Sequence, residues 1–386
     1  MITGFVGCLT RVWARLKACA QRFISTLLYP HQHKEDTKMA NVKISALPST
    51  LGASSLASAD LIAIVDSSAV ETKKMAADSF AIFKGITTGS MLSADLIATL
   101  TGEYDTVYGI EAGDSLTAAD DAVFIGYRAG YAATSGGNNV FVGSQAGYSL
   151  TTAEENVFVG YLAGYTNTSG AENVFIGSEC GELNTTGDYS VHIGYQAGYN
   201  QTTGDYNILV GHQAGVLLTE GLHNTVVGAG ALASVTTEDY NVAIGYKALE
   251  DAEASNNVAV GHNAGLNLTS GAYAVFVGKD AGGLGIITGA NNVGVGYRAG
   301  YDLTSGANNV LIGYQAGQSV TTGGNNISIG SDALETITTQ SHNIAIGYQA
   351  LQDAAASDNT AIGYQAGLNL TSGALNVFVG KNAGGL

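Results

Sequence analysis

Short apolar segments of three residues recur from about residue 105 onwards, and each is followed at once by glycine. Val140-Phe141-Val142 before Gly143 is typical. The residue three positions before the glycine is Val, Ile or Thr in every repeat, and the residue one position before it is Val or Ile except at Tyr108. These two positions share one face of a strand, and β-branched residues favour extended backbone. The pattern predicts one short strand per repeat.

The glycine that closes each segment, here called the marker glycine, returns at a nearly fixed interval. Successive markers are 17 residues apart, apart from two gaps of 16 and one of 18. The seventeen markers are Gly109, Gly126, Gly143, Gly160, Gly177, Gly194, Gly211, Gly228, Gly245, Gly261, Gly278, Gly296, Gly313, Gly330, Gly347, Gly363 and Gly380. So short a tandem period predicts a solenoid with one repeat per coil. We expect an all-β, parallel β-roll solenoid of about 17 coils, a rod roughly 80 Å long at ~4.8 Å per coil.

Other positions in the coil are almost as regular. Ala stands three positions after the marker in all coils but one, where Cys180 replaces it as a buried small residue. Gly follows in thirteen coils and Leu in the other four, which predicts a tight inner corner. Asn precedes the strand in thirteen coils, from Asn139 to Asn376. Stacked Asn side chains are expected to form a hydrogen-bonded ladder.

The middle residue of each strand lies on the opposite face from its β-branched neighbours, yet it is often apolar. A strand that is apolar on both faces needs a second partner, and a long exposed apolar stripe promotes association. We therefore expect these residues to form an interface between copies of the chain. The alternative is that they pack under the polar turn of their own coil. The interface candidates are Phe124, Phe141, Phe158, Phe175, Phe276, Leu311 and Phe378.

Charge divides the chain into parts. Residues 1–38 carry six Lys or Arg and two acidic residues, a net charge of +4. Residues 39–386 carry nine Lys or Arg and thirty acidic residues, a net charge of −21. We predict a basic amphipathic leader over 1–38, which need not belong to the fold, a small α+β attachment unit over 39–103, and the β-roll over 104–386. So acidic a rod would repel nucleic acid. No apolar run is long enough to span a membrane, and three cysteines make no disulfide framework.

Two resemblances suggest a setting for the rod. Asn241-Val242-Ala243-Ile244-Gly245 and Asn343-Ile344-Ala345-Ile346-Gly347 resemble the head repeats of YadA-like trimeric autotransporter adhesins, over roughly residues 105–386. This resemblance implies a left-handed parallel β-roll that trimerises side by side, although the usual coil is shorter than 17 residues. Lys43-Ile44-Ser45-Ala46-Leu47-Pro48 resembles the start of many phage tail-fibre proteins, where that segment attaches the fibre to the particle.

Catalytic chemistry is not indicated by the sequence. The seven histidines occupy unrelated repeat positions without metal-ligand spacing, and the recurring glycines lack the Lys-Ser/Thr of a phosphate loop. We expect no enzyme activity, cofactor or metal. Tyrosines after the marker glycine suit sugar or protein contact, although each could instead belong to a structural ladder. The contact candidates are Tyr127, Tyr161, Tyr195, Tyr297, Tyr314, Tyr348 and Tyr364.

These features favour a homotrimeric phage tail fibre that contacts a glycan or protein of the host-cell surface and joins the virion tail through residues 39–103. The second interpretation is a bacterial surface adhesin head, extracellular on the bacterial cell surface. The third is an ice-binding solenoid, suggested by one threonine per coil at Thr134, Thr151, Thr168, Thr185, Thr202 and Thr219. Their place at a turn rather than on a flat strand weakens the third interpretation.

Overall fold

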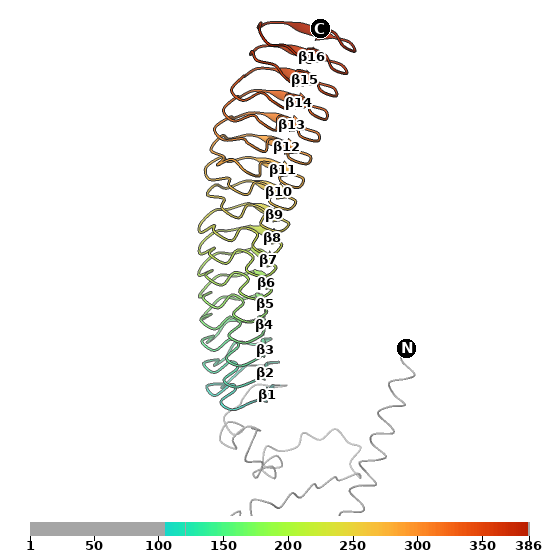
Figure 1. Ribbon diagram of the computed structural model, residues 1–386. Helices are drawn as coiled ribbons and strands as arrows, with labels where there is room; N and C mark the ends of the chain where they lie inside the picture. Colours follow the sequence, from blue (N-terminus) through green and yellow to red (C-terminus); the bar gives the residue numbers. More distant parts are fainter. Residues whose placement is uncertain (1–104, 120, 385–386) are drawn as a thin grey trace, which may run out of the picture. The chain divides into compact units, whose positions relative to one another are not determined.

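The described part of the chain forms a gently curved rod of stacked coils (Figure 1). The computed structural model describes residues 105–119 and 121–384. The leader and the attachment unit predicted before residue 104 lie outside these residues. Each coil holds one three-residue strand. The strands are β1 (Thr106–Tyr108), β2 (Val123–Ile125), β3 (Val140–Val142), β4 (Val157–Val159), β5 (Val174–Ile176), β6 (Val191–Ile193), β7 (Ile208–Val210), β8 (Thr225–Val227), β9 (Val242–Ile244), β10 (Val258–Val260), β11 (Val275–Val277), β12 (Val293–Val295), β13 (Val310–Ile312), β14 (Ile327–Ile329), β15 (Ile344–Ile346), β16 (Thr360–Ile362) and β17 (Val377–Val379).

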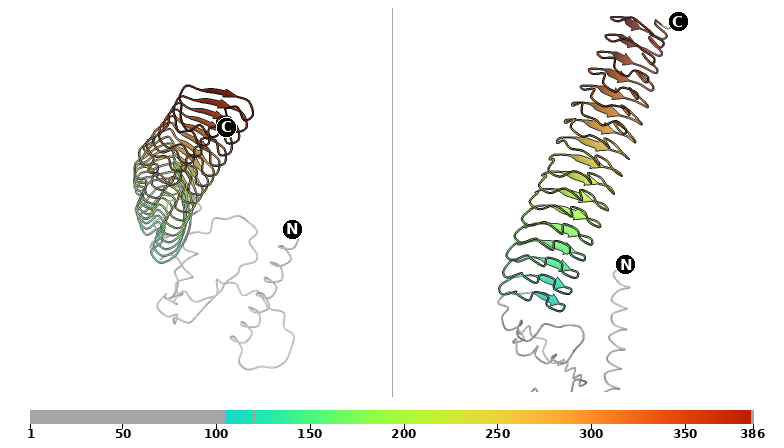
Figure 2. Two further views of the ribbon diagram at one scale, coloured as in Figure 1. Left: turned by 45° about the horizontal axis from the view of Figure 1, so that its top comes forward. Right: turned by 60° about the vertical axis from the view of Figure 1, so that its left-hand side comes forward.

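Consecutive strands pair in parallel, so that the seventeen strands make one continuous sheet along the rod (Figure 2). The register is the same at every step: Val123 pairs with Val140, and Val140 pairs with Val157. The steps of 16 and 18 residues keep this register, since Val242 pairs with Val258 and Val275 with Val293. The predicted all-β parallel solenoid is therefore confirmed. The left-handed sense implied by the resemblance stays a prediction.

The middle residue of each strand points into the coil, and its two neighbours point outward. Phe124, Phe141, Phe158, Phe175, Phe276 and Leu311 are fully buried within a single chain, and Phe378 is half-buried in the last strand. The prediction that they form an interface between copies is therefore wrong. They pack inside their own coil, as the alternative held. The rings of Phe124, Phe141, Phe158 and Phe175 stack with centroids 4.9–5.0 Å apart.

Marker glycines bring adjacent coils into close contact. Their φ angles lie between +125° and +145°, a region that only glycine adopts readily. A Cβ atom on Gly143 would overlap the carbonyl oxygen of Gly160 in the next coil, and this contact recurs at each marker up to Gly363. Any side chain at the marker would therefore separate two coils.

Three further positions per coil have left-handed backbone. Residues five before and two after the marker adopt it in nearly every coil although they are seldom glycine, as at Asn138 and Gln145. The residue four after the marker does so as Gly, or as Leu232, Leu249, Leu334 or Leu351 with φ between +48° and +52°. Non-glycine residues in this conformation are strained. Contacts with the coils above and below offset that strain.

Those four leucines compensate for small residues in the strand. Coils with a buried Phe have Gly four positions after the marker, and a Cβ on Gly147 would touch the ring of Phe141. Where Leu replaces that Gly, the middle strand residue is small: Val226, Ala243, Ser328 or Ala345. In these coils one side of the core compensates for the volume of the other, as close packing demands. Beside Ala259 and Ala361, where Gly265 and Gly367 are also small, side chains of the adjacent coils fill the space instead.

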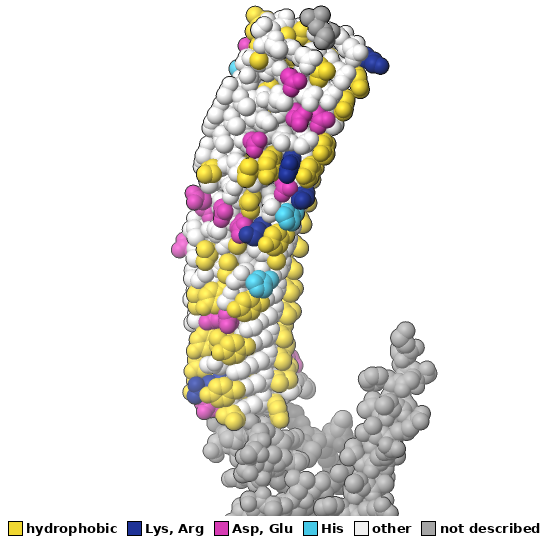
Figure 3. Space-filling view, in the orientation of Figure 1, with side chains coloured by type: hydrophobic (Ala, Val, Ile, Leu, Met, Phe, Trp, Pro, Cys, Tyr) yellow, Lys and Arg dark blue, Asp and Glu magenta, His cyan; other side chains and the backbone are white. Residues whose placement is uncertain are grey.

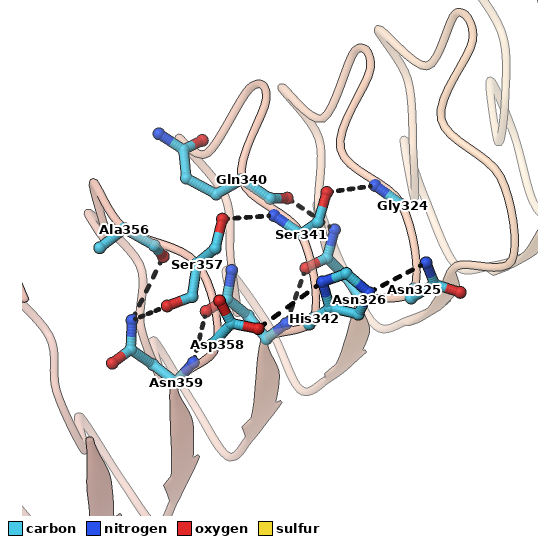
Figure 4. Close-up of polar contacts among 11 residues, drawn as sticks. Gly324, Asn325, Asn326, Gln340, Ser341, His342, Ala356, Ser357, Asp358 and Asn359 are labelled. Carbon is cyan, nitrogen blue, oxygen red and sulfur yellow. Dashed lines mark hydrogen bonds and ion pairs between the residues drawn. The ribbon is translucent and has the colours of Figure 1, made fainter. Parts of the chain in front are cut away.

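The predicted Asn ladder is confirmed. The backbone N–H of Asn156 donates to Oδ1 of Asn139 at 2.9 Å, while Nδ2 of Asn139 donates to the Ala153 carbonyl at 2.8 Å. The Oδ1 bond to the next coil recurs along the ladder, and Asn156, Asn309 and Asn326 repeat both bonds while fully buried. Figure 4 shows Asn326, whose Nδ2 donates to the Gln340 carbonyl of the next coil, and Asn359, whose Nδ2 donates to the Ala356 and Ser357 carbonyls of its own coil. Beside them, the hydroxyls of Ser341 and Ser357 accept backbone N–H groups of the preceding coil.

His192 continues the phenylalanine stack, with its ring 4.5 Å from that of Phe175. It is fully buried, and neither ring nitrogen has a hydrogen-bond partner. Burial lowers the pKa of His192 to about 3, because the charged form cannot be solvated. The neighbouring Cys180 is buried in the place of Ala, as predicted, and burial raises the pKa of its thiol to about 12.

Replacement of a marker glycine should disrupt the stack. We expect Gly143→Ala to lower the free energy of unfolding by more than about 3 kcal/mol, through backbone strain and overlap with Gly160. The matched control is Gly230→Asn, because Gly230 has φ of +64° and a Cβ there would meet only the Lys247 side chain, at an ordinary contact distance of 3.5 Å. Asn263 stands at the same position in another coil. Urea titration of both variants tests this, and equal stability of the two would refute it.

His192→Phe should stabilise the rod by extending the phenylalanine stack and removing two unpartnered nitrogens. The folded pKa lies below the ordinary value of 6.5, so protonation favours the unfolded state. His192 should therefore make the natural chain lose about 1.4 kcal/mol per pH unit as pH falls from 6.5 toward 3. Stability of both chains measured across this range should show the difference growing at low pH. A constant difference would contradict the burial of a neutral imidazole.

Candidate functional site

Strict register turns each outward position of the coil into a column that runs along the rod. Two such surfaces run along the rod. The Val/Ile face consists of the first and third residue of every strand. The ring column consists of the residue after each marker glycine. It comprises Ile110, Tyr127, Ser144, Tyr161, Ser178, Tyr195, His212, Ala229, Tyr246, His262, Lys279, Tyr297, Tyr314, Ser331, Tyr348, Tyr364 and Lys381.

The Val/Ile face is an apolar surface that follows the whole sheet. Figure 3 shows hydrophobic side chains aligned along one edge of the rod. Many third-position residues expose 36–40 % of their surface: Ile125, Ile176, Ile193, Val227, Ile244, Ile312, Ile329 and Ile362. First-position residues are mostly half-buried, as at Val140 and Val157. Contiguous apolar patches of this extent mark interaction surfaces.

Tyrosines of the ring column lie at the surface. Tyr127, Tyr161, Tyr195, Tyr314, Tyr348 and Tyr364 expose 41–52 % of their surface, and Tyr297 is half-buried. The structure separates them into two kinds. Tyr297 stacks on Tyr314 with centroids 5.4 Å apart, and Tyr348 stacks on Tyr364 at 5.2 Å. Tyr127, Tyr161 and Tyr195 are instead separated from one another by coils that carry Ser144 and Ser178.

Cations lie over several of these rings. The Arg128 guanidinium is 5.0 Å from the ring centroid of Tyr127, and Arg298 is 5.2 Å from that of Tyr297. Lys381 Nζ lies 5.4 Å from the Tyr364 ring. The Glu111 carboxylate pairs with Arg128 and raises the pKa of its guanidinium. The attraction between each cation and the ring face favours this position of the ring at the surface.

A further tyrosine column lies five residues after the marker. Tyr131, Tyr148 and Tyr165 stack with centroids 5.0 Å apart at each step. Each is half-buried. The faces of the middle ring are covered by its neighbours, so this group fits a structural ladder that ties one coil to the next.

The sequence analysis missed one aromatic ladder, five residues before the marker. Tyr189, Tyr206, His223 and Tyr240 stack with centroids 4.8–5.0 Å apart, all in left-handed backbone. The Glu172 carboxylate of the preceding coil raises the pKa of Tyr189. Recurrence of an aromatic ring at the same place in four successive coils is the signal that could have revealed it. Asn or an acidic residue fills this position in most other coils and conceals the signal.

Titratable groups do not gather into a reactive site in the part of the chain that the structure covers. Burial raises the pKa of Glu182 and of Asp302. These two residues lie five and six residues after their marker glycines, in coils far apart along the rod. Among residues 105–119 and 121–384, no three His, Cys, Asp or Glu side chains lie close enough to hold a metal ion. No helix within these ranges could cross a bilayer.

Comparison with known proteins gives no relative: no protein-family model, no curated protein and no solved structure matches this chain.

Proposed function

We propose that this protein is a fibre made of several parallel copies, which attaches to a cell surface. The observation that carries the proposal is the Val/Ile face, whose third-position residue is Val or Ile in every strand from β2 to β17. Two outward residues per strand give more contact positions than the roughly 20–30 residues that each side of a standard protein interface contributes. A second copy of the same chain offers a face of matching length and repeat.

The proposed interface replaces the one expected from the sequence. Phenylalanines fill the interior of each coil, and the β-branched residues beside them meet the other copies. Packing Val and Ile of flat parallel strands against one another removes apolar surface from water at about 25 cal/mol per Å². The number of three copies comes from the resemblance to trimeric adhesin heads.

We further propose a phage tail fibre as the setting, located in the virion tail. Support comes from the resemblance at residues 43–48 and from the rod, whose sides project regular columns of aromatic rings. The ring column would contact a glycan or protein of the host surface, because tyrosine combines an apolar face with a polar tip. A bacterial surface adhesin would use the same two surfaces and stays the alternative.

The threonines that suggested ice binding serve the rod itself. The hydroxyl of Thr134 donates to the carbonyl of Thr151 at 3.0 Å, and that of Thr185 donates to Thr202 at 2.9 Å. The same bond recurs at Thr151, Thr168, Thr202 and Thr219. Each of these threonine hydroxyls donates its proton to a carbonyl of the next coil and cannot donate it to water. This argues against an ice-binding role for the threonine column.

Introducing charged side chains on the Val/Ile face should dissociate the fibre without unfolding the coils. We expect the natural full chain to behave as a trimer in light scattering after size exclusion. The double variant Ile176→Lys/Ile193→Lys should give a monomer with an unchanged circular dichroism spectrum, because unpaired ammonium groups would be buried at the interface. A monomeric natural chain would contradict the proposal.

Leu217→Lys is the matched control. Leu217 is 45 % exposed but lies six residues after its marker glycine, outside the Val/Ile face. This variant should keep the mass of the natural chain. Dissociation by Leu217→Lys as well would mean that the interface lies elsewhere on the rod.

A further inference from the structure

The ring column follows a simple rule along the rod. Neighbouring rings lie either in adjacent coils, in contact with each other, or two coils apart, with one coil between them that carries no ring. In all separated pairs but one, the intervening residue is small. The small residues are Ser144, Ser178, Ala229 and Ser331. The exception is Lys279, whose Nζ lies 5.9 Å from the Tyr297 ring.

Backbone register places these rings one above the other, on either side of the small residue. Leu162 N–H donates to the Ser144 carbonyl and Glu179 N–H to the Tyr161 carbonyl, at 3.1 and 2.7 Å. Gln196 N–H likewise donates to the Ser178 carbonyl at 3.0 Å. Residues of the ring column therefore sit directly above one another. Tyr161 and Tyr195 are the walls of a gap whose floor is Ser178, here called the Ser178 gap.

The gap has a definite width. Rings one coil apart have centroids 5.2 Å apart at Tyr348 and Tyr364. Two coils therefore place the walls about 10 Å apart, at ~4.8 Å per step. A flat aromatic ring held between two others at carbon contact distance needs only roughly 7 Å. A saturated six-membered ring with hydrogens on both faces is thicker, and it fits this width better.

Both walls of the Ser178 gap are available from solvent. Tyr161 exposes 50 % of its surface and has serines on both sides in its column. Tyr195 exposes 43 % and lies at a tilt of 36° to His212 of the next coil, with centroids 5.3 Å apart. Groups that bind hydroxyls lie beside the floor. Glu179 follows Ser178, and its carboxylate accepts a hydrogen bond of 2.7 Å from Gln196 Nε2.

We propose that each of these gaps takes one pyranose ring of a neutral glycan, with its C–H faces against the two aromatic walls. The inference rests on the proposed role in surface attachment. Where rings of this column stack, as at Tyr348 and Tyr364, their faces point along the rod. With walls in that orientation, the sugar enters edge-on from the side. Only a terminal or side-branch sugar can enter in this way. Neutrality follows from Glu179 and Glu182, whose carboxylates would repel an anionic sugar.

Four gaps along one rod explain how weak single contacts give firm attachment. Ser144 and Ser178 lie two coils apart and share Tyr161 as a wall, while Ala229 and Ser331 lie further along the same column. Repeated side-branch sugars of a cell-surface polysaccharide would occupy several gaps together. Linked sites multiply affinity without any new contact.

Filling the gaps with rings is the direct test. Ser144→Tyr, Ser178→Tyr, Ala229→Tyr and Ser331→Tyr, combined in the full chain, would make the column a continuous stack like Tyr297–Tyr314. The fold should be retained, since tyrosine already stands at this position in other coils. The probes are methyl α-glucopyranoside, methyl α-galactopyranoside and methyl α-mannopyranoside, measured by saturation-transfer NMR.

We expect at least one glycoside to bind the natural chain and the filled variant to lose about tenfold in affinity. Tyr148→Ser, which removes a tyrosine outside the ring column, should bind as the natural chain does. Binding of none of the three glycosides, or equal binding by the filled variant, would overturn the proposal. Competition by lipopolysaccharide or by a high-mannose glycoprotein would identify a lipid-borne or protein-borne glycan.

Failure of this inference can be told apart from failure of the proposed function. A chain that forms a trimer but binds no glycoside refutes the gaps alone. A chain that binds glycosides through the gaps yet stays monomeric refutes the fibre alone.

Discussion

The close approach of each marker glycine to the next is the constraint on which the rest of the structure depends. At φ near +140°, without a Cβ atom, the chain turns out of the strand while its neighbour's carbonyl lies against it. This contact sets the spacing and register of successive coils. Left-handed residues at three further positions complete the turns of the coil, so that four of about seventeen residues have backbone that most side chains disfavour.

Register then converts one coil's pattern into continuous columns. Inside the rod it gives the stacked phenylalanines, and at the corner it gives the Asn ladder, in which Oδ1 of one Asn accepts the backbone N–H of the next coil. On the outside it gives the Val/Ile face and the ring column. Because every coil contacts only its neighbours, stability is approximately a sum of such local terms. A single disrupted step should then weaken the rod locally.

The sequence was enough to predict the period, the strand positions, the Asn ladder and the burial of Cys180, because each depends on residue type at a fixed place. It did not show which face of the strand points inward. Alternation over three residues defines two faces that are both apolar here. The missing information lay in two pairs of positions. One coil combines the large Phe141 with Gly147, and another combines the small Ala243 with Leu249. Such compensation in volume is expected only of residues that share one core. Gaps in the ring column depend on register and exposure, which composition alone does not reveal.

The central claim is that coil register places an apolar face between copies and leaves the ring column in solvent. A structure of the assembled full chain by electron cryo-microscopy tests this most directly. The account predicts several parallel rods whose Val/Ile faces meet at the same coil height, with Phe141 inside its coil and Tyr161 exposed. Val/Ile faces in contact with solvent, or Tyr161 buried between copies, would contradict it.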